Sequence, residues 1–167
     1  MTVTTETTAP GAIIGSLVYR FEGRLAGLNP IGLFADGIRF HNEFDGTIVA
    51  GPFSGGRISG LDRFLLRPDG VGELLAPEVI EAGEHRVGLD VRGYVVPPPG
   101  TPVPPLEAVL EPGFEPPDVD YRVTGTALAA TTAPGFEHLN RTTVVIEGTV
   151  NLATGRLVVE ARTVERA

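Results

Sequence analysis

Hydrophobic and polar residues alternate along most of the chain, and this pattern predicts β-strands. The segment SLVYRFE is typical, because Leu17, Tyr19 and Phe21 occupy every second position in it. A period of two places such residues on one face of a half-buried strand. The same alternation, or a short β-branched run, predicts further strands at residues 37–44, 47–50, 57–59, 61–67, 71–75, 85–96, 121–128, 141–150 and 156–164.

Turn signals separate these strands. Pro68-Asp69-Gly70 combines a residue that presets φ with one that accepts positive φ. Asn151 to Gly155 joins two β-branched runs and predicts a hairpin. Pro77 is expected to end the strand that begins at Val71. Many short strands without a long helix predict an all-β fold.

Among all-β folds we favour a single antiparallel β-barrel of about eight strands, because closure removes exposed strand edges. A barrel of this size has room inside for side chains or for one small ligand. A β-sandwich is the alternative that the strand pattern leaves open.

The segment 97–117 interrupts the strand pattern, because it holds nine of the 15 prolines of the chain. It contains a single helical turn, Leu106 to Leu110. The 50 residues that follow it are too few to form a second domain with a hydrophobic core of its own. We therefore expect one barrel domain over residues 13–167, with 97–117 as a long loop that covers one mouth as a lid. Residues 1–12 are expected to form a polar tail.

Composition excludes several classes of protein. The net charge is −8, with 13 basic and 21 acidic residues, which argues against nucleic acid as a partner. The chain has no cysteine, so thiol catalysis and disulfides are excluded. No secretory signal and no run of about 18 apolar residues is present, so neither export nor a membrane partner is expected. The default expectation is a cytoplasmic protein, and its size allows a homodimer.

A series of short motifs occurs in a characteristic order along the chain. They are Gly51-Pro52, Gly55-Gly56, Gly60-Leu61-Asp62, Arg67-Pro68-Asp69-Gly70, Arg92-Gly93, a strand that begins at Tyr121, and Leu139-Asn140-Arg141. In order and spacing this series resembles the bacterial family of uncharacterised small β-barrel proteins known as domain of unknown function 3237. The resemblance extends over roughly residues 47–165. The residue before Leu139 departs from the family pattern, since His138 stands where members commonly have Trp.

The resemblance implies a compact barrel with a central cavity, similar to calycin and allene-oxide-cyclase-like barrels. Such barrels include both binding proteins and enzymes, so the resemblance does not imply one reaction.

Strand parity predicts which side chains face the lumen. Where one face of a strand carries charged groups, that face is expected outside. Within the predicted strands, this rule places four polar or aromatic side chains inside, namely Tyr19, Asp62, Phe64 and Tyr121. If the alternation of the strand at 141–150 is continued towards the N-terminus, Asn140 and His138 also face the lumen. A mostly apolar pocket with a few polar groups is typical of a small-molecule site.

Each polar candidate has two interpretations. Asp62 either caps a turn or is a buried acid or base with a raised pKa. Asn140 and Arg141 either tie a loop to the rim or hold a carbonyl or enolate oxygen of the substrate. His138 is either a solvated histidine or a proton shuttle. Tyr19 and Tyr121 either pack in the core or contact the ligand.

The strand at 85–96 permits two orientations. Asp90, Arg92 and Tyr94 share one face, opposite Val91 and Val95. The parity rule places the charged face outside, where an ion pair contributes little. The alternative is that the lumen holds Asp90, Arg92 and Tyr94 as a set that binds a polar group of the substrate, and the resemblance at Arg92 supports this second interpretation.

These observations predict a cofactor-independent cyclase, isomerase or lyase that acts on a hydrophobic, polyketide-like or aromatic-like molecule in an enclosed cavity. Asp62, Tyr121, Asn140 and Arg92 are the candidate catalytic residues. Tyr19, Phe64, Tyr94, His138 and Arg141 are the candidate substrate-binding residues. No metal site and no cofactor are expected. A non-catalytic carrier or sensor of a hydrophobic ligand, and a structural barrel that binds another protein, are the alternatives.

Overall fold

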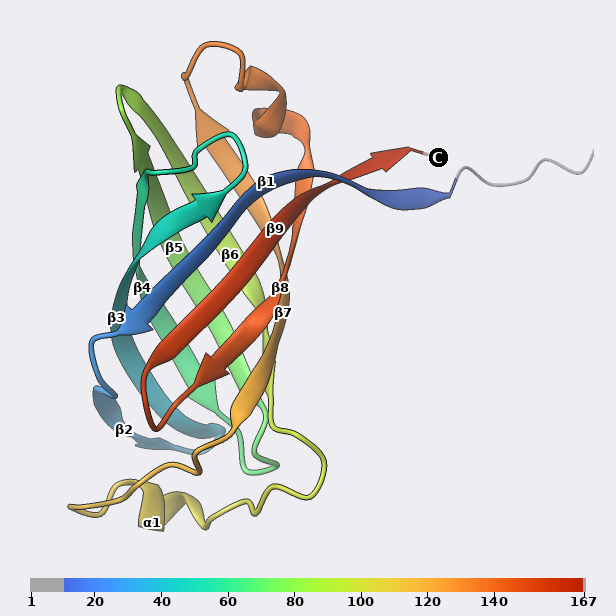
Figure 1. Cartoon of the computed structure of the whole chain (residues 1–167). Helices are drawn as coiled ribbons and strands as arrows, with labels where there is room; N and C mark the ends of the chain where they lie inside the picture. Colours follow the sequence, from blue (N-terminus) through green and yellow to red (C-terminus); the bar gives the residue numbers. More distant parts are fainter. Residues whose placement is uncertain (1–10, 167) are drawn as a thin grey trace, which may run out of the picture.

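Eight antiparallel strands close into a barrel, and a ninth short strand extends its sheet (Figure 1). The computed structural model describes residues 11–166. The strands are β1 (Ala12–Leu25), β2 (Pro30–Phe34), β3 (Gly37–Ala50), β4 (Arg57–Leu66), β5 (Gly72–Ala82), β6 (His85–Val96), β7 (Asp120–Thr131), β8 (Thr143–Asn151) and β9 (Arg156–Arg166). Each strand from β3 to β9 pairs with the next, β9 pairs with β1, and β1 closes the barrel by pairing with β3. The predicted all-β barrel is therefore confirmed. Most of the tail predicted for residues 1–12 lies outside the described residues.

Three predicted strand breaks are absent from the structure. β3 and β4 are each one continuous strand where the pattern indicated two, and β5 runs through Pro77. Pro77 is tolerated because the ladder between β4 and β5 opens around it, between the pairs Gly60–Glu78 and Leu65–Glu73. Proline has no backbone N–H to donate, so at an unpaired position of the ladder its presence removes no hydrogen bond between the strands. The prediction that Pro77 ends a strand is wrong for this reason.

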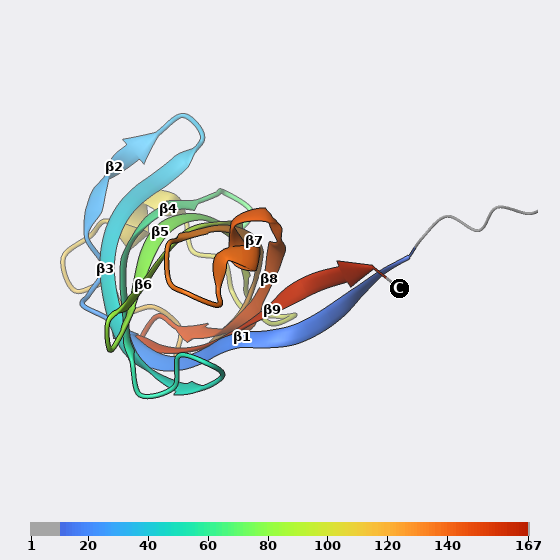
Figure 2. The same cartoon turned by 90° about the horizontal axis from the view of Figure 1, so that it is seen from above.

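The two ends of the barrel are covered differently. The connection between β6 and β7, which contains the short helix α1 (Leu106–Val109), crosses one mouth (Figure 1). At the other end, the connection between β7 and β8 carries the 3-10 helix η1 (Glu137–Arg141) and lies over the opening (Figure 2). Within residues 11–166, no helix is long and apolar enough to cross a membrane.

Many fully buried side chains fill the half of the barrel nearest η1. They include those of Tyr19, Ile48, Phe53, Ile58, Ile80, Val87 and Val144. Towards the α1 end, the rings of Phe40 and Phe64 lie 6.0 Å apart. The free space of the barrel lies in this second half.

Candidate functional site

An apolar chamber of about 60 Å³ lies inside the barrel, in the half away from η1. We call it the inner chamber, and its lining residues are Phe21, Leu25, Asn42, Phe44, Asp62, Phe64, Leu74, Ala76, Glu78, Val91, Val95, Val123, Ile146, Val150, Leu152, Leu157 and Val159. Three of these side chains are polar, namely Asn42, Asp62 and Glu78, and they come from the adjacent strands β3, β4 and β5. The strands β6 to β9 contribute only apolar side chains to this lining. The polar groups are thus gathered on one wall.

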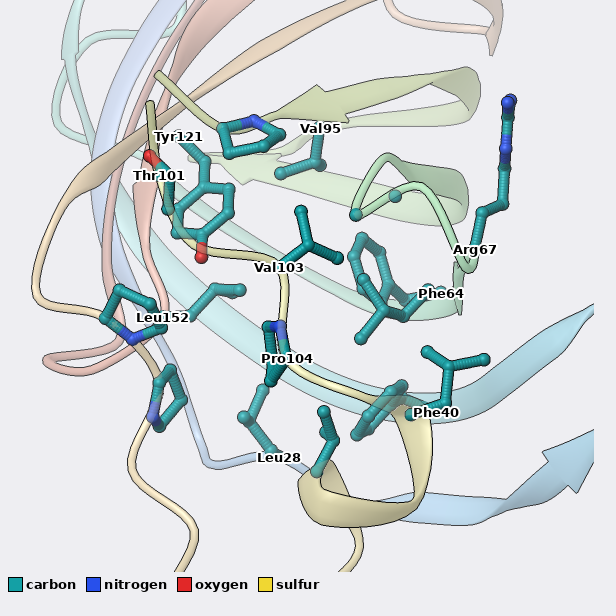
Figure 3. Close-up of a pocket in the computed structure, with 18 of the residues that line it drawn as sticks. Leu28, Phe40, Phe64, Arg67, Val95, Thr101, Val103, Pro104, Tyr121 and Leu152 are labelled. Atoms are coloured by element: carbon teal, nitrogen blue, oxygen red, sulfur yellow. The ribbon is translucent and has the colours of Figure 1, made fainter. Parts of the chain in front are cut away.

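A second chamber of about 60 Å³, the outer chamber, lies between the barrel mouth and the β6–β7 connection (Figure 3). Val103, Pro104 and Leu106 of that connection form part of its wall. Phe64, Val95 and Leu152 line both chambers, so the outer chamber lies directly in front of the inner one. Each is large enough for water but smaller than the roughly 300–1,000 Å³ of a typical ligand pocket. The two chambers together also fall below this range, so a ligand of ordinary size requires a movement of the β6–β7 connection.

Asp62 lies at the open section of the β4–β5 ladder. The backbone N–H of Leu75, from β5, interacts with its carboxylate and lowers its pKa. The other oxygen, Oδ1, is buried and has no hydrogen-bond partner among the described residues. Burial raises the pKa of Asp62 from 3.8 to about 7, although the Leu75 hydrogen bond acts in the opposite direction. Asp62 is therefore a carboxyl group with a free oxygen and a pKa near neutrality.

Glu78 is a second buried carboxyl group on the same wall. Its Oε2 accepts a hydrogen bond of 3.3 Å from the Tyr19 hydroxyl. Burial raises the pKa of Glu78 to about 8, the Tyr19 hydrogen bond opposes this shift, and the nearby charge of Asp62 adds to it. Burial and the charge of Glu78 hold the pKa of Tyr19 well above its ordinary value, so Tyr19 stays a neutral donor.

Asn42 faces Asp62 directly across the β3–β4 ladder. Its side chain is 2% exposed, and its Oδ1 accepts a 2.9 Å hydrogen bond from the backbone N–H of Asn29. This bond fixes the orientation of the amide, so Asn42 contributes a rigid polar neighbour for Asp62.

Neither Glu78 nor Asn42 was among the sequence candidates. A signal for Glu78 exists, because Leu74, Ala76, Glu78 and Ile80 alternate along β5. The assumption that Pro77 ends the strand concealed this alternation. Asn42 shares a face with Ile38 and Phe40 in the sequence. Because asparagine is also common in turns, its presence on this face does not by itself indicate a site residue.

Glycine residues shape the chamber wall. A Cβ atom at Gly60 would lie 2.6 Å from the ring of Phe44, and one at Gly72 would lie 2.1 Å from the ring of Phe64. Both rings line the inner chamber, so the two glycines make room for the aromatic walls. This is a physical reason for the Gly60-Leu61-Asp62 motif that the sequence analysis singled out.

Four sequence candidates lie in the barrel interior. Asp62 and Phe64 line the inner chamber, and Tyr19 lies fully buried beside it through its bond to Glu78. Tyr121 lines the outer chamber, and its hydroxyl points into it (Figure 3). Burial raises the pKa of Tyr121 above its ordinary value of 10.0. The structure thus brings Asp62 and Phe64 together in one chamber, while Tyr19 and Tyr121 lie on either side of it.

Three candidates lie at the other end of the barrel, away from both chambers. Asn140, His138 and Arg141 are exposed residues of η1. The side chain of Asn140 binds both backbone groups of Thr131, with distances of 2.7 and 2.9 Å. The prediction that Asn140 and His138 face the lumen is wrong, because β8 begins only at Thr143 and strand parity does not extend into a helix. Asn140 instead ties the connection to the barrel.

The remaining two candidates lie on the outer surface. Arg92 and Tyr94 are exposed, and Tyr94 is 50% accessible, whereas Val91 and Val95 on the opposite face of β6 are buried. The alternative in which Arg92 and Tyr94 bind the substrate inside the barrel is therefore wrong. The simple parity rule describes this strand correctly.

Among residues 11–166, no group of three or more His, Asp or Glu side chains is arranged to hold a metal ion.

No protein-family model and no curated protein matches this sequence. Solved structures do share its fold. A β-barrel-like protein from Acinetobacter baumannii is 21% identical, with a TM-score of 0.72, over 96% of this chain and 100% of that one. A conserved protein of unknown function from Rhodopseudomonas palustris is 19% identical, with a TM-score of 0.68, over 95% and 100%. An enzyme from Penicillium herquei is 17% identical, with a TM-score of 0.52, over 96% and 99%. At these identities the likeness establishes the barrel fold.

Proposed function

We propose that this barrel is a cofactor-independent enzyme that moves a proton on a hydrophobic small molecule, in a reaction of the cyclase, isomerase or lyase kind. The observation that carries the proposal is the buried, unpartnered Oδ1 of Asp62 in the wall of the inner chamber. Buried polar atoms in proteins almost always have partners, so an exception calls for an explanation. A reacting substrate would supply the missing partner.

The environment of Asp62 suits general base catalysis. A base works best when its pKa is close to the working pH, and burial brings the pKa of Asp62 to about 7. The opposite wall of the chamber is apolar and offers a carboxylate no hydrogen-bond donor, so a carboxylate there is poorly solvated and reactive. Buried ionisable groups with shifted pKa values, such as Asp62 and its neighbour Glu78, are typical of catalytic sites.

The chamber walls also suit a hydrophobic substrate. Phe21, Phe44 and Phe64 provide broad apolar surfaces on the wall that carries Asp62. A rigid, shaped cavity can hold a flexible molecule in one reactive conformation. We propose that substrate enters through the outer chamber, past the β6–β7 connection as a lid, and that Tyr121 offers it a hydroxyl group on the way.

The motif series supports membership in the family of domain of unknown function 3237, which we also propose. Gly60-Leu61-Asp62 places the acid in the inner chamber, and the turn of Arg67 to Gly70 borders the outer one. The enzyme from Penicillium herquei shares the fold and is compatible with catalysis by such a barrel.

The test is proton exchange on a simple ketone. Purified protein is incubated with cyclohexanone in deuterated water, and NMR follows deuterium uptake at the carbon next to the carbonyl. The wild type should accelerate uptake, and Asp62→Asn should abolish the acceleration while leaving ketone binding intact. Asp90→Asn removes an exposed carboxyl group from β6 and is the matched control, which should exchange like the wild type.

Two outcomes would overturn the proposal. If the wild type binds cyclohexanone but never exchanges its protons, the barrel is a carrier or sensor of hydrophobic ligands. If cyclohexanone does not bind at all, the chambers are packing defects and the barrel serves a structural role.

A further inference from the structure

We infer that Asp62 and Glu78 divide one proton transfer between them: Asp62 takes a proton from the carbon beside a carbonyl group, while Glu78, held by Tyr19, donates a hydrogen bond to the carbonyl oxygen. The substrate class is then an uncharged hydrophobic ketone or enone with an acidic C–H. This inference rests on the proposed function, in which Asp62 is the base, and adds a second catalytic residue, a positioning residue and a substrate class.

The strand register places the two carboxyl groups near each other. Gly60 pairs with Glu78, and Asp62 is two residues further along β4, on the same face. Such diagonal neighbours have Cα atoms roughly 7–8 Å apart, with side chains closer. Both side chains line the inner chamber, and they lie close enough for the charge of Asp62 to raise the pKa of Glu78. A carbonyl compound in this chamber is therefore presented to both groups.

The surroundings of the two groups differ in a way that separates their roles. Asp62 accepts a backbone N–H bond from Leu75, which favours its ionised form. Glu78 is more completely enclosed and lies beside the charge of Asp62, which favours its neutral form. Two coupled carboxyl groups lose their protons in two steps, and between these steps the pair holds a single proton. One base and one acid are then present together, and burial and the charge of Asp62 favour the proton on Glu78.

The groups that face this pair are uncharged. Tyr19 from β1 donates to Glu78, which by itself favours the ionised form of Glu78, but the effect of burial on its pKa is larger. Asn42 from β3 is an uncharged amide opposite Asp62. The side chains that β6 to β9 present to the chamber are apolar. A protonated carboxyl group in an apolar site is an effective hydrogen-bond donor to a developing oxyanion, as in ketosteroid isomerase.

Charge also restricts the substrate. The inner chamber is lined by two carboxyl groups and by no Lys, Arg or His side chain. The basic residue of the outer chamber, Arg67, is already paired with Asp69 and Glu73. A carboxylate or phosphate on the substrate would be repelled and left without a counter-ion, so the substrate is uncharged where it enters the chamber.

The step balances without an oxidant, a reductant or a cofactor. The carboxylate of Asp62 takes the proton, the electrons of the broken C–H bond form a C=C bond, and the electron pair of the carbonyl π bond moves onto the oxygen. The resulting enolate oxygen accepts the hydrogen bond of Glu78, which keeps its proton. In an enone, Asp62 then returns the proton to a different carbon of the conjugated enolate, the C=O bond forms again, the C=C bond has moved and both groups are restored. The net reaction is an isomerisation.

The first test uses proton exchange of cyclohexanone with variants of Glu78. Glu78→Met removes the donor and should slow exchange by about 10²–10³, the range that one oxyanion donor provides. Glu78→Gln keeps an N–H donor and should retain a large part of the rate. Glu81→Gln, an exposed carboxyl group on the same strand, is the control. Circular dichroism melting confirms that each variant is folded.

The second test measures the carbonyl group and the acid directly. The C=O stretching frequency of bound cyclohexanone should fall in the wild type and return towards its free value in Glu78→Met. Carbon-13 NMR of labelled carboxyl groups should show Glu78 protonated near neutral pH, with Tyr19→Phe altering its titration. Cyclohexanecarboxylate should bind far more weakly than cyclohexanone.

The outcomes separate the two proposals. If Asp62→Asn abolishes exchange while Glu78→Met exchanges like the wild type and leaves the carbonyl frequency unchanged, the division of roles is wrong and the proposed function stands. If the wild type shows no exchange, both are wrong. If cyclohexanecarboxylate binds as tightly as cyclohexanone, the substrate class is wrong.

Discussion

The Tyr19 hydroxyl donates a hydrogen bond of 3.3 Å to Oε2 of Glu78, and this bond connects β1 with β5 through the interior of the barrel. The two strands are separated by β3 and β4 around the sheet. Both side chains are buried, so each satisfies a polar group that water cannot reach.

Tyr19→Phe should therefore destabilise the protein by about 1–3 kcal/mol, because it leaves a buried oxygen of Glu78 without its partner. The same change removes a bond that lowers the pKa of Glu78, so this pKa should rise further. Chemical denaturation measures the stability, and carboxyl NMR measures the pKa. Tyr94→Phe on the outer surface is the control, and equal stability of the two variants would contradict the argument.

The stability of the protein should fall as the pH rises from about 5 to about 8. The folded-state pKa values of Asp62 and Glu78, about 7 and about 8, lie above their ordinary values of 3.8 and 4.5. Between these limits the folded state holds more protons than the unfolded state, so raising the pH favours unfolding, by on the order of 1 kcal/mol per pH unit for each group.

Denaturant titrations across this pH range check the prediction. The double variant Asp62→Asn, Glu78→Gln should show a nearly flat profile, because neither side chain can ionise. A wild-type profile that is equally flat would show that the two carboxyl groups are better solvated than their burial indicates.

Asn140→Ala should lower the stability by about 1–2 kcal/mol without changing ligand binding. The side chain of Asn140 binds the N–H and the C=O of Thr131, and it lies at the end of the barrel away from the chambers. Thermal melting and a ketone-binding titration measure the two effects separately. His138→Ala in the same helix, where the side chain is exposed, should leave both quantities unchanged. Loss of binding in Asn140→Ala would restore Asn140 as a site residue.

Gly60→Ala should destabilise the barrel by about 1–3 kcal/mol through overpacking. Its Cβ atom would lie 2.6 Å from the Phe44 ring and 2.7 Å from the backbone oxygen of Pro77. Gly88→Ala is a matched strand control, because the nearest atom to its Cβ would be 3.8 Å away. Denaturant unfolding of both variants checks the prediction, and an equal effect would mean that the wall is not tightly packed at Gly60.

Leu152→Trp should block ligand binding while the fold is retained. Leu152 is a half-buried residue of the β8–β9 turn that lines both chambers, so a larger side chain there fills the passage between them. Binding of cyclohexanone, followed by NMR, should be lost, and the melting temperature should change little. Unchanged binding would show that ligands reach the inner chamber by another route.

The sequence was informative wherever a strand alternates without interruption. The parity rule placed Tyr19, Asp62 and Phe64 inside, and it placed the charged face of β6 outside. It failed at Asn140 and His138, because alternation was continued across a boundary where the backbone changes from strand to helix. It missed Glu78 because Pro77 indicates the end of a strand, whereas β5 continues through Pro77 to Ala82.

What the sequence by itself determined is the barrel and the inward position of Asp62, because alternation of apolar and polar residues is a local property of each strand. What only the tertiary structure decided is the meeting of Asp62 with Glu78, Tyr19 and Asn42. That meeting depends on strand register and on the open ladder at Pro77, and both are set by pairing between segments far apart in the chain. The raised pKa values follow from the burial that this pairing creates.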